Sequence, residues 1–388
     1  MSLGIYLHLP FCRVRCSYCP FVVTTNVRQQ DQYTEALLRE IDARAGGEHV
    51  DTIFFGGGTP SRTSLENLSR LVARLRERFD IAGDAEFSLE ANPEDITPDS
   101  LAAWRALGVN RISIGVQSFH DTELRPLGRV HGPQRARDAI RDAVATGART
   151  SLDLILGLPY QTAESFRATL ETAIGSGAGH ISLYMLDLEE GTALKRQVEQ
   201  GKVVLPDDEL VASVYADAVE RLGAAGLEQY EISNFGDPCR HNLRYWRREE
   251  YLGFGAGAHS FVGNRRFANT RDVDRYIDAF VTPSVSEGPG GVEGAPPAPP
   301  DPSLTLGMTA VDFAETLSDA DVRRETIFLR LRQTEGIDYD DVVRLCGAGG
   351  TEWIERGLSD GWLRRKGPRV AFTSSGFLLS NDYISQLF

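Results

Sequence analysis

The chain has 388 residues, of which 41% are hydrophobic, and a formal net charge of −14. This length suffices for a sizeable core and predicts two or three domains, while the negative charge argues against a general nucleic-acid binder, which needs a basic surface. No run of about 18 apolar residues predicts a membrane helix and no signal peptide is visible, so we expect a cytoplasmic protein.

The first predicted element is a short apolar strand at residues 4–9, which Pro10 ends. A loop with three cysteines follows, and their spacing is C-x3-C-x2-C, at Cys12, Cys16 and Cys19. Cysteine thiolates hold iron–sulfur clusters, and a four-iron cluster normally takes four of them. The spacing therefore predicts a [4Fe-4S] cluster with one iron open to a ligand from outside the protein.

The alternatives to a cluster are a zinc site or inert cysteines. Zinc knuckles favour a second cysteine pair or histidines downstream, and neither follows this motif. The other two cysteines, Cys239 and Cys346, lie far along the chain. With only five cysteines in total, so tight a group favours the cluster and a reducing compartment.

Helical stretches and strands then alternate up to about residue 190. The predicted strands lie at 52–55, 86–91, 111–116, 151–156 and 180–186, and the helices near 31–45, 64–78, 98–107, 132–147 and 162–175. Such βα units imply a parallel sheet with right-handed crossovers. Because six units are two short of a closed eight-stranded barrel, we predict a partial, open (β/α)6 barrel, with its site at the carboxyl ends of the strands.

A glycine-rich loop follows the second predicted strand and contains Gly56, Gly57, Gly58 and Thr59. Glycines let a backbone pass close to a ligand with no side chain in the way. Alone, this pattern is typical of a plain strand-to-helix turn, and it gains weight from the cysteine motif before it. It is not a Walker loop, since the Gly-Lys-Ser/Thr ending is missing.

Polar side chains recur at the ends of the later strands, at Glu90, Gln117 and Asp153. A charged Asp153 within so apolar a strand is costly to bury without a partner, which favours a functional role. Glu90 and Gln117 are equally compatible with solvated strand ends, and Arg129 with a surface position.

Beyond residue 190 the sequence predicts several different kinds of segment. We predict a helix at 207–227, a strand at 228–235 and a flexible Pro- and Gly-rich insertion at 284–303. Helical periodicity at 323–333 and 338–345 and a β-like pair at 362–365 and 369–373 predict a small winged-helix-like accessory domain. The predicted division is a core at 1–190, a barrel extension at 191–283, the insertion, and an accessory domain at 304–388.

Seven motifs resemble those of the radical-SAM branch that contains the oxygen-independent coproporphyrinogen III oxidase, and most closely those of the HemW haem chaperones. They are Tyr-Leu-His-Leu-Pro-Phe-Cys, Gly-Gly-Gly-Thr-Pro-Ser, Gly-Val-Gln-Ser-Phe, Leu-Gly-Arg-Val-His, Asp-Leu-Ile-Leu-Gly-Leu-Pro, Gln-Tyr-Glu-Ile-Ser-Asn-Phe and His-Asn-Leu-Arg-Tyr-Trp. The resemblance runs from residue 4 to the carboxyl terminus, interrupted mainly by the insertion.

This resemblance implies a [4Fe-4S] cluster on the three clustered cysteines. It also implies bound S-adenosylmethionine, with contacts from the glycine loop, two flanking tyrosines and four polar side chains, namely Gly57, Gly58, Thr59, Tyr6, Tyr18, Glu90, Gln117, Arg129 and Asp153. Such residue types suit a zwitterionic sulfonium, whose cationic groups need carboxylates and whose carboxylate needs an arginine.

The resemblance assigns haem handling to the segment from Cys239 to Trp246. Histidine is the commonest protein ligand to haem iron, and Tyr245 with Trp246 would stack on a porphyrin, so His241 is the candidate haem contact. The alternative is that His241 is a hydrogen-bonded buried histidine and the aromatic pair is core. His259 is a second candidate ligand, and we expect His8 to be structural.

Two departures separate the chain from the oxidase. The oxidase resemblance implies a fourth cysteine two residues after the third, where this chain has Phe21, and a long amino-terminal extension, whereas the first cysteine here is already residue 12. Both favour the chaperone subgroup, which implies delivery of haem to apo-haemoproteins, with respiratory clients and transient contact with a membrane surface expected. The alternatives are a coproporphyrinogen III decarboxylase and radical opening or methylation of a porphyrin. A homodimer and cleavage of S-adenosylmethionine are left open.

Overall fold

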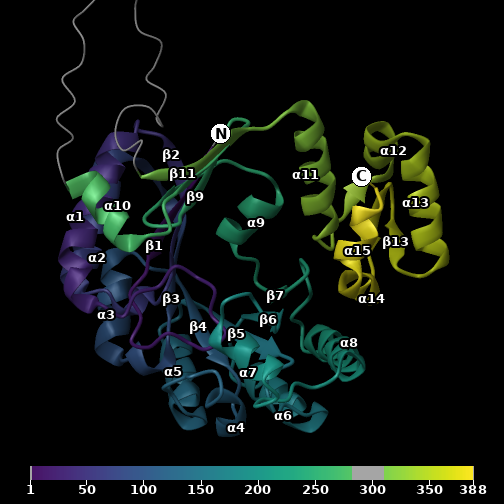
Figure 1. Cartoon of the computed structure of the whole chain (residues 1–388), viewed down its shortest axis with the longest axis horizontal. Helices are drawn as coiled ribbons and strands as arrows, with labels where there is room; N and C mark the ends of the chain where they lie inside the picture. Colours follow the sequence, from purple (N-terminus) through teal and green to yellow (C-terminus); the bar gives the residue numbers. More distant parts are fainter. Residues whose placement is uncertain (1, 282–309, 388) are drawn as a thin grey trace, which may run out of the picture.

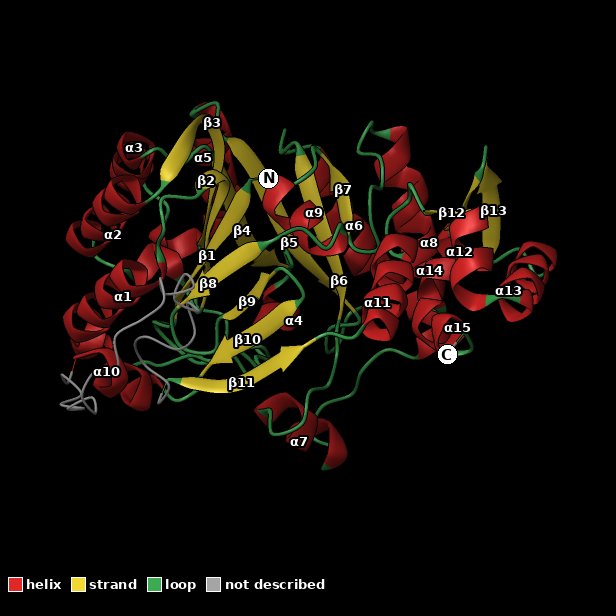
Figure 2. Cartoon of the chain, turned by 90° about the horizontal axis from the view of Figure 1, so that it is seen from above, coloured by secondary structure: helices red, strands yellow, loops and turns green. Residues whose placement is uncertain are grey.

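The computed structural model describes residues 2–281 and 310–387, and its main feature is one large sheet (Figures 1 and 2). The strand order is β11-β10-β9-β8-β1-β2-β3-β4-β5-β6-β7. Neighbouring strands pair in parallel from β1 to β6, which are Leu3–Leu9, His49–Gly57, Asp80–Ala91, Arg111–Gln117, Arg149–Leu156 and His180–Met185. The sheet is open, with β7 and β11 at its edges, which confirms the predicted partial barrel.

Helices that connect these strands cover the outer face of the sheet (Figure 1). The main ones are α1 (Gln30–Arg44), α2 (Leu65–Arg78), α3 (Pro98–Leu107), α5 (Pro133–Ala145) and α6 (Ala163–Ile174), with a short α4 (Asp121–Leu124). Side-chain hydrogen bonds cap the amino termini of several helices. Reciprocal capping boxes begin α3 at Thr97 and α6 at Thr162. The five predicted helices agree with these bounds within two residues.

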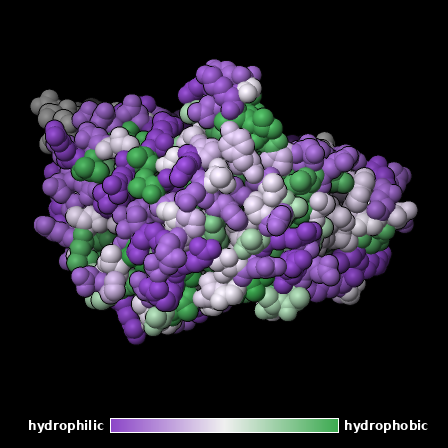
Figure 3. Space-filling model, turned by 90° about the horizontal axis from the view of Figure 1, so that it is seen from below, coloured by the Kyte–Doolittle hydropathy of each residue, from purple (hydrophilic) through white to green (hydrophobic). Residues whose placement is uncertain are grey.

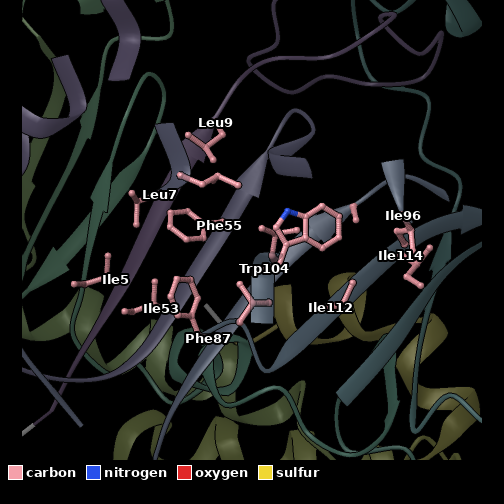
Figure 4. Packing of buried hydrophobic residues seen from close by; sticks show 14 of the residues in the cluster. Ile5, Leu7, Leu9, Ile53, Phe55, Phe87, Ile96, Trp104, Ile112 and Ile114 are labelled. Atoms are coloured by element: carbon pink, nitrogen blue, oxygen red, sulfur yellow. The ribbon is translucent and has the colours of Figure 1, made fainter. Parts of the chain in front are cut away.

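Alternation along the strands separates the core from the barrel interior. In β1, Ile5 and Leu7 are fully buried and lie near Ile53 and Phe55, in a hydrophobic cluster that also contains Trp104 (Figure 4). Tyr6, which lies between them on the other face of the strand, lines interior cavities instead. The same period of two therefore builds the core on one face and the site on the other.

Further strands extend the sheet at both edges. On the β1 side lie β8 (Tyr251–Phe254), β9 (His259–Val262), β10 (Arg265–Asn269) and β11 (Val311–Thr316), and on the β6 side lies β7 (Asn234–Gly236). The remaining helices of this part are α7 (Ala193–Glu199), α8 (Asp208–Ala224), α9 (Arg240–Trp246) and α10 (Val273–Val281). Helix α8 matches the prediction at 207–227.

The predicted strand at 228–235 is wrong for most of its length, because only Asn234–Gly236 forms a strand. Glu231 is fully buried, and its carboxylate accepts the backbone N–H of Ser233 at 3.2 Å. This local bond bends the chain where a regular ladder would need it extended.

A separate small unit follows β11. It contains α11 (Asp319–Leu331), β12 (Ile337–Asp338), α12 (Tyr339–Cys346), α13 (Ala348–Ser359), β13 (Leu363–Lys366), β14 (Arg369–Phe372), α14 (Ser374–Leu378) and α15 (Ser380–Ser385). It has its own sheet, β12-β14-β13, and its own core around Trp353 and Tyr383. This order agrees with the predicted winged-helix type, although β11 pairs in the large sheet, so the compact unit begins with α11. The predicted insertion at 284–303 lies outside the described residues.

One face of the surface is mainly hydrophilic. In Figure 3, hydrophobic residues appear there in small groups between hydrophilic ones. Within residues 2–281 and 310–387, no helix has the length and apolar character that crossing a bilayer requires.

Candidate cluster and cofactor site

A cavity of about 420 Å³ opens at the carboxyl ends of the parallel strands, against the cysteine loop. Eleven of the predicted cluster and cofactor residues line it, namely Cys12, Cys16, Cys19, Tyr18, Gly57, Gly58, Thr59, Glu90, Gln117, Arg129 and Asp153. Tyr6 does not, because it lies between two neighbouring cavities. The fold therefore gathers residues that are up to 141 positions apart, from Cys12 to Asp153, around one space.

Backbone hydrogen bonds hold the cysteine loop in place. The N–H of Cys12 donates to Thr24 O at 2.9 Å, and that of Thr24 donates to Pro10 O at 2.8 Å. Further along, the N–H of Ser17 donates to Leu127 O at 3.0 Å. The loop is thus fixed at both ends and in its middle, which fits a rigid ligand-bearing segment.

The thiols are suited to bind iron. Burial raises the pKa of the Cys12 thiol to about 11 and also raises the pKa of Cys19, and a bound metal reverses this by deprotonating a coordinating thiol. In the described part of the chain, no three His, Cys, Asp or Glu side chains lie close enough together to hold one metal ion. Cys12, Cys16 and Cys19 line one cavity, where their thiolates would hold a [4Fe-4S] cluster, and this assignment stays a prediction.

The glycine loop packs tightly against the first strand and the cysteine loop. A Cβ built on Gly58 would lie 2.6 Å from the carbonyl of Pro10 and 3.0 Å from Cys12 Sγ, and one on Gly57 would lie 2.7 Å from the His8 ring. Gly57 also has a φ of +115°, which favours glycine. These two glycines therefore allow close packing against β1 and the cysteine loop, and their contact with S-adenosylmethionine stays a prediction.

Two largely buried carboxyl groups line the same cavity. Burial, aided by the charge of Asp153, raises the pKa of Glu90 to about 8, while Glu90 accepts the N–H of Gly57 at 3.1 Å. Burial also raises the pKa of Asp153 to about 6, against hydrogen bonds from Ser182 and Ser113 that lower it. Such a pair is costly to ionise unless a cation is bound beside it, so the geometry suits a cationic ligand.

Arg129 supplies a positive charge in the same cavity. Its Nη2 donates to Asn92 Oδ1 at 2.6 Å and to Gly115 O at 2.5 Å, and its Nη1 lies 3.8 Å from Cys16 Sγ. Gln117 follows a β-bulge and has a φ of 65°. A non-glycine residue in this conformation is strained by about 1–3 kcal/mol and such residues cluster at functional sites.

The sequence did not single out two polar residues of this cavity. Asn92 accepts from Arg129, and the Ser113 hydroxyl donates to Asp153 Oδ1 at 3.1 Å. The sequence pattern could have indicated both residues, because Asn92 is two residues after Glu90 and Ser113 is four before Gln117. Period-two counting from the assigned positions would have found them.

Glu90 gives a stability prediction for the ligand-free protein. Since its folded pKa of about 8 exceeds its ordinary value of 4.5, the folded state binds the extra proton, and stability falls as pH rises between these values. We expect Glu90→Gln to be more stable than wild type at pH 9 by on the order of 2 kcal/mol, with little difference at pH 5. Urea unfolding of both proteins at the two pH values measures this. Equal stabilities at pH 9 would contradict it.

The segment predicted to handle haem forms α9 and lines a second cavity of about 250 Å³. His241 is 1% exposed, and burial lowers its pKa to about 3. Its Nδ1 is hydrogen-bonded to Thr52 Oγ1 at 2.9 Å and its Nε2 to the Tyr245 hydroxyl at 2.8 Å. The alternative of a hydrogen-bonded buried histidine thus describes this conformation, and a haem contact by His241 stays a prediction.

A buried acid anchors the start of α9. Glu86 Oε1 accepts the His241 N–H at 3.1 Å and the Cys239 thiol at 3.4 Å, and Glu86 Oε2 accepts from Arg111 Nε at 3.0 Å. Arg111 Nη2 in turn donates to Pro238 O at 2.9 Å. The helix is thereby fixed to β3 and β4, beside the first cavity.

This chain is similar to known proteins in both fold and sequence. Residues 6–173 match the Radical SAM superfamily, whose members use a [4Fe-4S] cluster and S-adenosylmethionine. The solved structure of coproporphyrinogen III oxidase (HemN) from Escherichia coli, described as a radical SAM enzyme, superposes with a TM-score of 0.82 and 25% identity over 100% of this chain and 90% of that chain.

Several sequence relatives carry the name of a haem chaperone. The "Heme chaperone HemW" of Mycobacterium tuberculosis is 35% identical over 99% of this chain and 94% of its own length, and that of Bacillus subtilis is 33% identical over 97% of each. The Escherichia coli protein of the same name is 41% identical over 67% of this chain and 70% of its own length. With such identity over nearly its whole length, the chain belongs to the HemW haem chaperone family.

Proposed function

We propose that this protein is a radical-SAM-fold haem chaperone, which binds haem and transfers it to apo-haemoproteins. The observation that carries the proposal is its likeness to haem chaperones over nearly the whole chain. The proposal includes a [4Fe-4S] cluster on Cys12, Cys16 and Cys19 and S-adenosylmethionine in the adjoining cavity.

The chemistry of the cavity supports this cofactor pair. Glu90 and Asp153 would face the cationic groups of S-adenosylmethionine, and Arg129 would face its carboxylate. Tyr18 and the backbone of the glycine loop complete the wall. The cluster supplies an iron with a free coordination position when it is bound there.

A second candidate function is oxidative decarboxylation of coproporphyrinogen III, favoured by the structural likeness to HemN. Phe21 argues against it, because it takes the place at which the oxidase resemblance implies a fourth cysteine. Its side chain is 61% exposed and lines the cluster cavity. We therefore place the oxidase second.

The further partners follow from the chaperone proposal. We propose apo-haemoproteins of respiration as clients, transient contact with a membrane surface during delivery, and a cytoplasmic location. The acidic composition supports the expectation that nucleic acid is not a partner.

One anaerobically reconstituted sample tests the two candidate functions together. We expect haem to bind near stoichiometrically in a titration followed at the Soret band, and we expect no protoporphyrinogen IX from coproporphyrinogen III under reducing conditions. Multiple-turnover conversion would overturn the chaperone proposal in favour of the oxidase. Absence of haem binding by the loaded protein would overturn it as well.

A further inference from the structure

A third cavity, of about 410 Å³, lies between the end of the cysteine loop and strands β1, β8 and β9. It is not the cavity predicted for S-adenosylmethionine, and it does not contain His241. Two residues connect it to its neighbours, because Phe21 also lines the cluster cavity and Tyr245 also lines the cavity of α9. The sequence named Tyr6, Tyr245 and His259 among its lining residues, but it predicted no separate cavity here.

The loop after Cys19 is fixed at the edge of this cavity. His8 Nε2 donates to Val22 O at 2.8 Å, and Arg271 Nη2 donates to Pro20 O at 3.0 Å. On the other side, a Cβ built on Gly257 would lie 2.8 Å from Val22 Cγ2. The small residues before His259 thus let β9 approach the cysteine loop closely, so that His259 and Phe21 border the same space.

His259 differs from the other histidines that line the second and third cavities. His8 and His241 each use both ring nitrogens in hydrogen bonds within the protein, as does His180. His259 is exposed at the start of β9, and across residues 2–281 and 310–387 its ring nitrogens have no hydrogen-bond partner. Partial burial and the charges of Arg266 and Arg271 lower its pKa, which favours the neutral imidazole that binds iron.

Arg271 brings a positive charge to the same cavity. It is exposed, and it has no ion pair with a carboxylate in the part of the chain that the structure describes. A guanidinium with spare N–H groups is well suited to bind a carboxylate through charge-assisted hydrogen bonds. In a chain of net charge −14, an arginine without an acidic partner beside a cavity indicates an anionic ligand.

Aromatic rings supply the walls. Tyr245 and Tyr251 meet edge to face, with centroids 4.7 Å apart, and Phe21 is 61% exposed at the opening. Aromatic side chains around a cavity are typical of a binding site for a flat apolar ligand. Imidazole, guanidinium and aromatic walls together match the three parts of haem, namely its iron, its propionates and its ring.

We propose that this third cavity is the haem site, with His259 as a ligand to the iron and Arg271 bound to a propionate carboxylate. The inference rests on the proposed chaperone function and names its cargo site. In this proposal His241 does not bind the iron, and its hydrogen bond to the Tyr245 hydroxyl holds Tyr245 in the wall of the third cavity. Haem bound here would also contact Phe21, two residues after the last cluster cysteine.

Haem titration of the full reconstituted protein tests the iron ligand. We expect His259→Ala to shift the Soret band and to weaken haem binding at least about tenfold, a loss of ~1.4 kcal/mol, while added imidazole restores the spectrum. His49→Ala is the matched control, since His49 is an exposed histidine that pairs with Asp80 away from the cavities, and it should bind as wild type does. Iron and sulfide content should be unchanged in both variants.

Haem dimethyl ester tests the propionate contact. Wild type should bind it about tenfold more weakly than haem, whereas Arg271→Gln should bind the two compounds with similar affinity. If wild type binds haem but His259→Ala leaves its Soret band and affinity unchanged, the haem site proposed here is wrong. A Soret shift in His241→Ala alone would then place the ligand on α9. If wild type does not bind haem, the chaperone function itself fails.

Discussion

Replacement of Cys12, Cys16 and Cys19 together by Ala should abolish the iron–sulfur cluster. The anaerobically reconstituted wild type should hold about four irons per chain, with a broad visible absorbance that bleaches on reduction. All three cysteines line one cavity, and burial raises the pKa of the Cys12 and Cys19 thiols. Their removal leaves the iron without thiolate ligands, and iron and sulfide analysis measures the loss.

Cys346→Ala and Cys239→Ala are the matched controls, and both should retain the full cluster. Cys346 ends α12 in the small carboxyl-terminal unit. Cys239 is 7% exposed, and its thiol donates to Glu86 beside the second cavity. A triple variant with wild-type iron and sulfide would refute the central assignment of this site. If a control variant lost the cluster, the cysteine replaced in it would itself be a cluster ligand.

The triple variant should keep its fold. The cysteine loop is held by backbone hydrogen bonds from Cys12 and Ser17, which alanine preserves. The side-chain hydrogen bonds that the substitutions remove are weak, such as the one that the Thr59 hydroxyl donates to Cys12 Sγ at 3.3 Å. Circular dichroism before reconstitution therefore separates removal of the ligands from unfolding of the chain.

The sequence predicted the barrel and the first cavity well because both depend on short-range periodicity. Alternating βα units place every strand end at one edge of a parallel sheet, so Glu90 and Asp153 had to meet near the cysteine loop. The additional strands on the β1 side were not predicted. Residues 252–258, Leu-Gly-Phe-Gly-Ala-Gly-Ala, are too rich in small residues to show a strand pattern.

Long-range contacts explain the remaining differences. The two partners of His241 are Thr52, 189 residues away, and Tyr245, one helical turn away, and no local pattern reveals the first of these. Tyr6 and Tyr18 both looked like cofactor neighbours, yet only Tyr18 lines the cluster cavity. Tyr6 lies in the strand itself, where its hydroxyl is hydrogen-bonded to His8 Nδ1 at 3.1 Å. Tyr18 lies in the cysteine loop, whose position depends on contacts far apart in sequence, such as the hydrogen bond from Ser17 N–H to Leu127 O.

Asp153→Asn should weaken the binding of S-adenosylmethionine about tenfold to a hundredfold and leave the cluster intact. The change removes a buried negative charge and keeps the size of the side chain, and a hydrogen bond to a charged group contributes about 1.5–3 kcal/mol. Ser113 would still donate to the remaining amide oxygen. Calorimetry on reconstituted protein measures the affinity. Asp138→Asn is the matched control, since Asp138 pairs with Arg141 on the exposed side of α5.

The pH dependence of the same binding separates a charge effect from a packing effect. A cationic ligand prefers ionised carboxylates, so wild-type affinity should rise as pH increases through about 6 and about 8, the pKa values of Asp153 and Glu90. The charge of Asp153 is the second cause of the raised pKa of Glu90, after burial. In Asp153→Asn the rise should therefore move to lower pH. Wild-type affinity and an unshifted profile in this variant would mean that Asp153 only shapes the cavity and that the cationic ligand is held elsewhere.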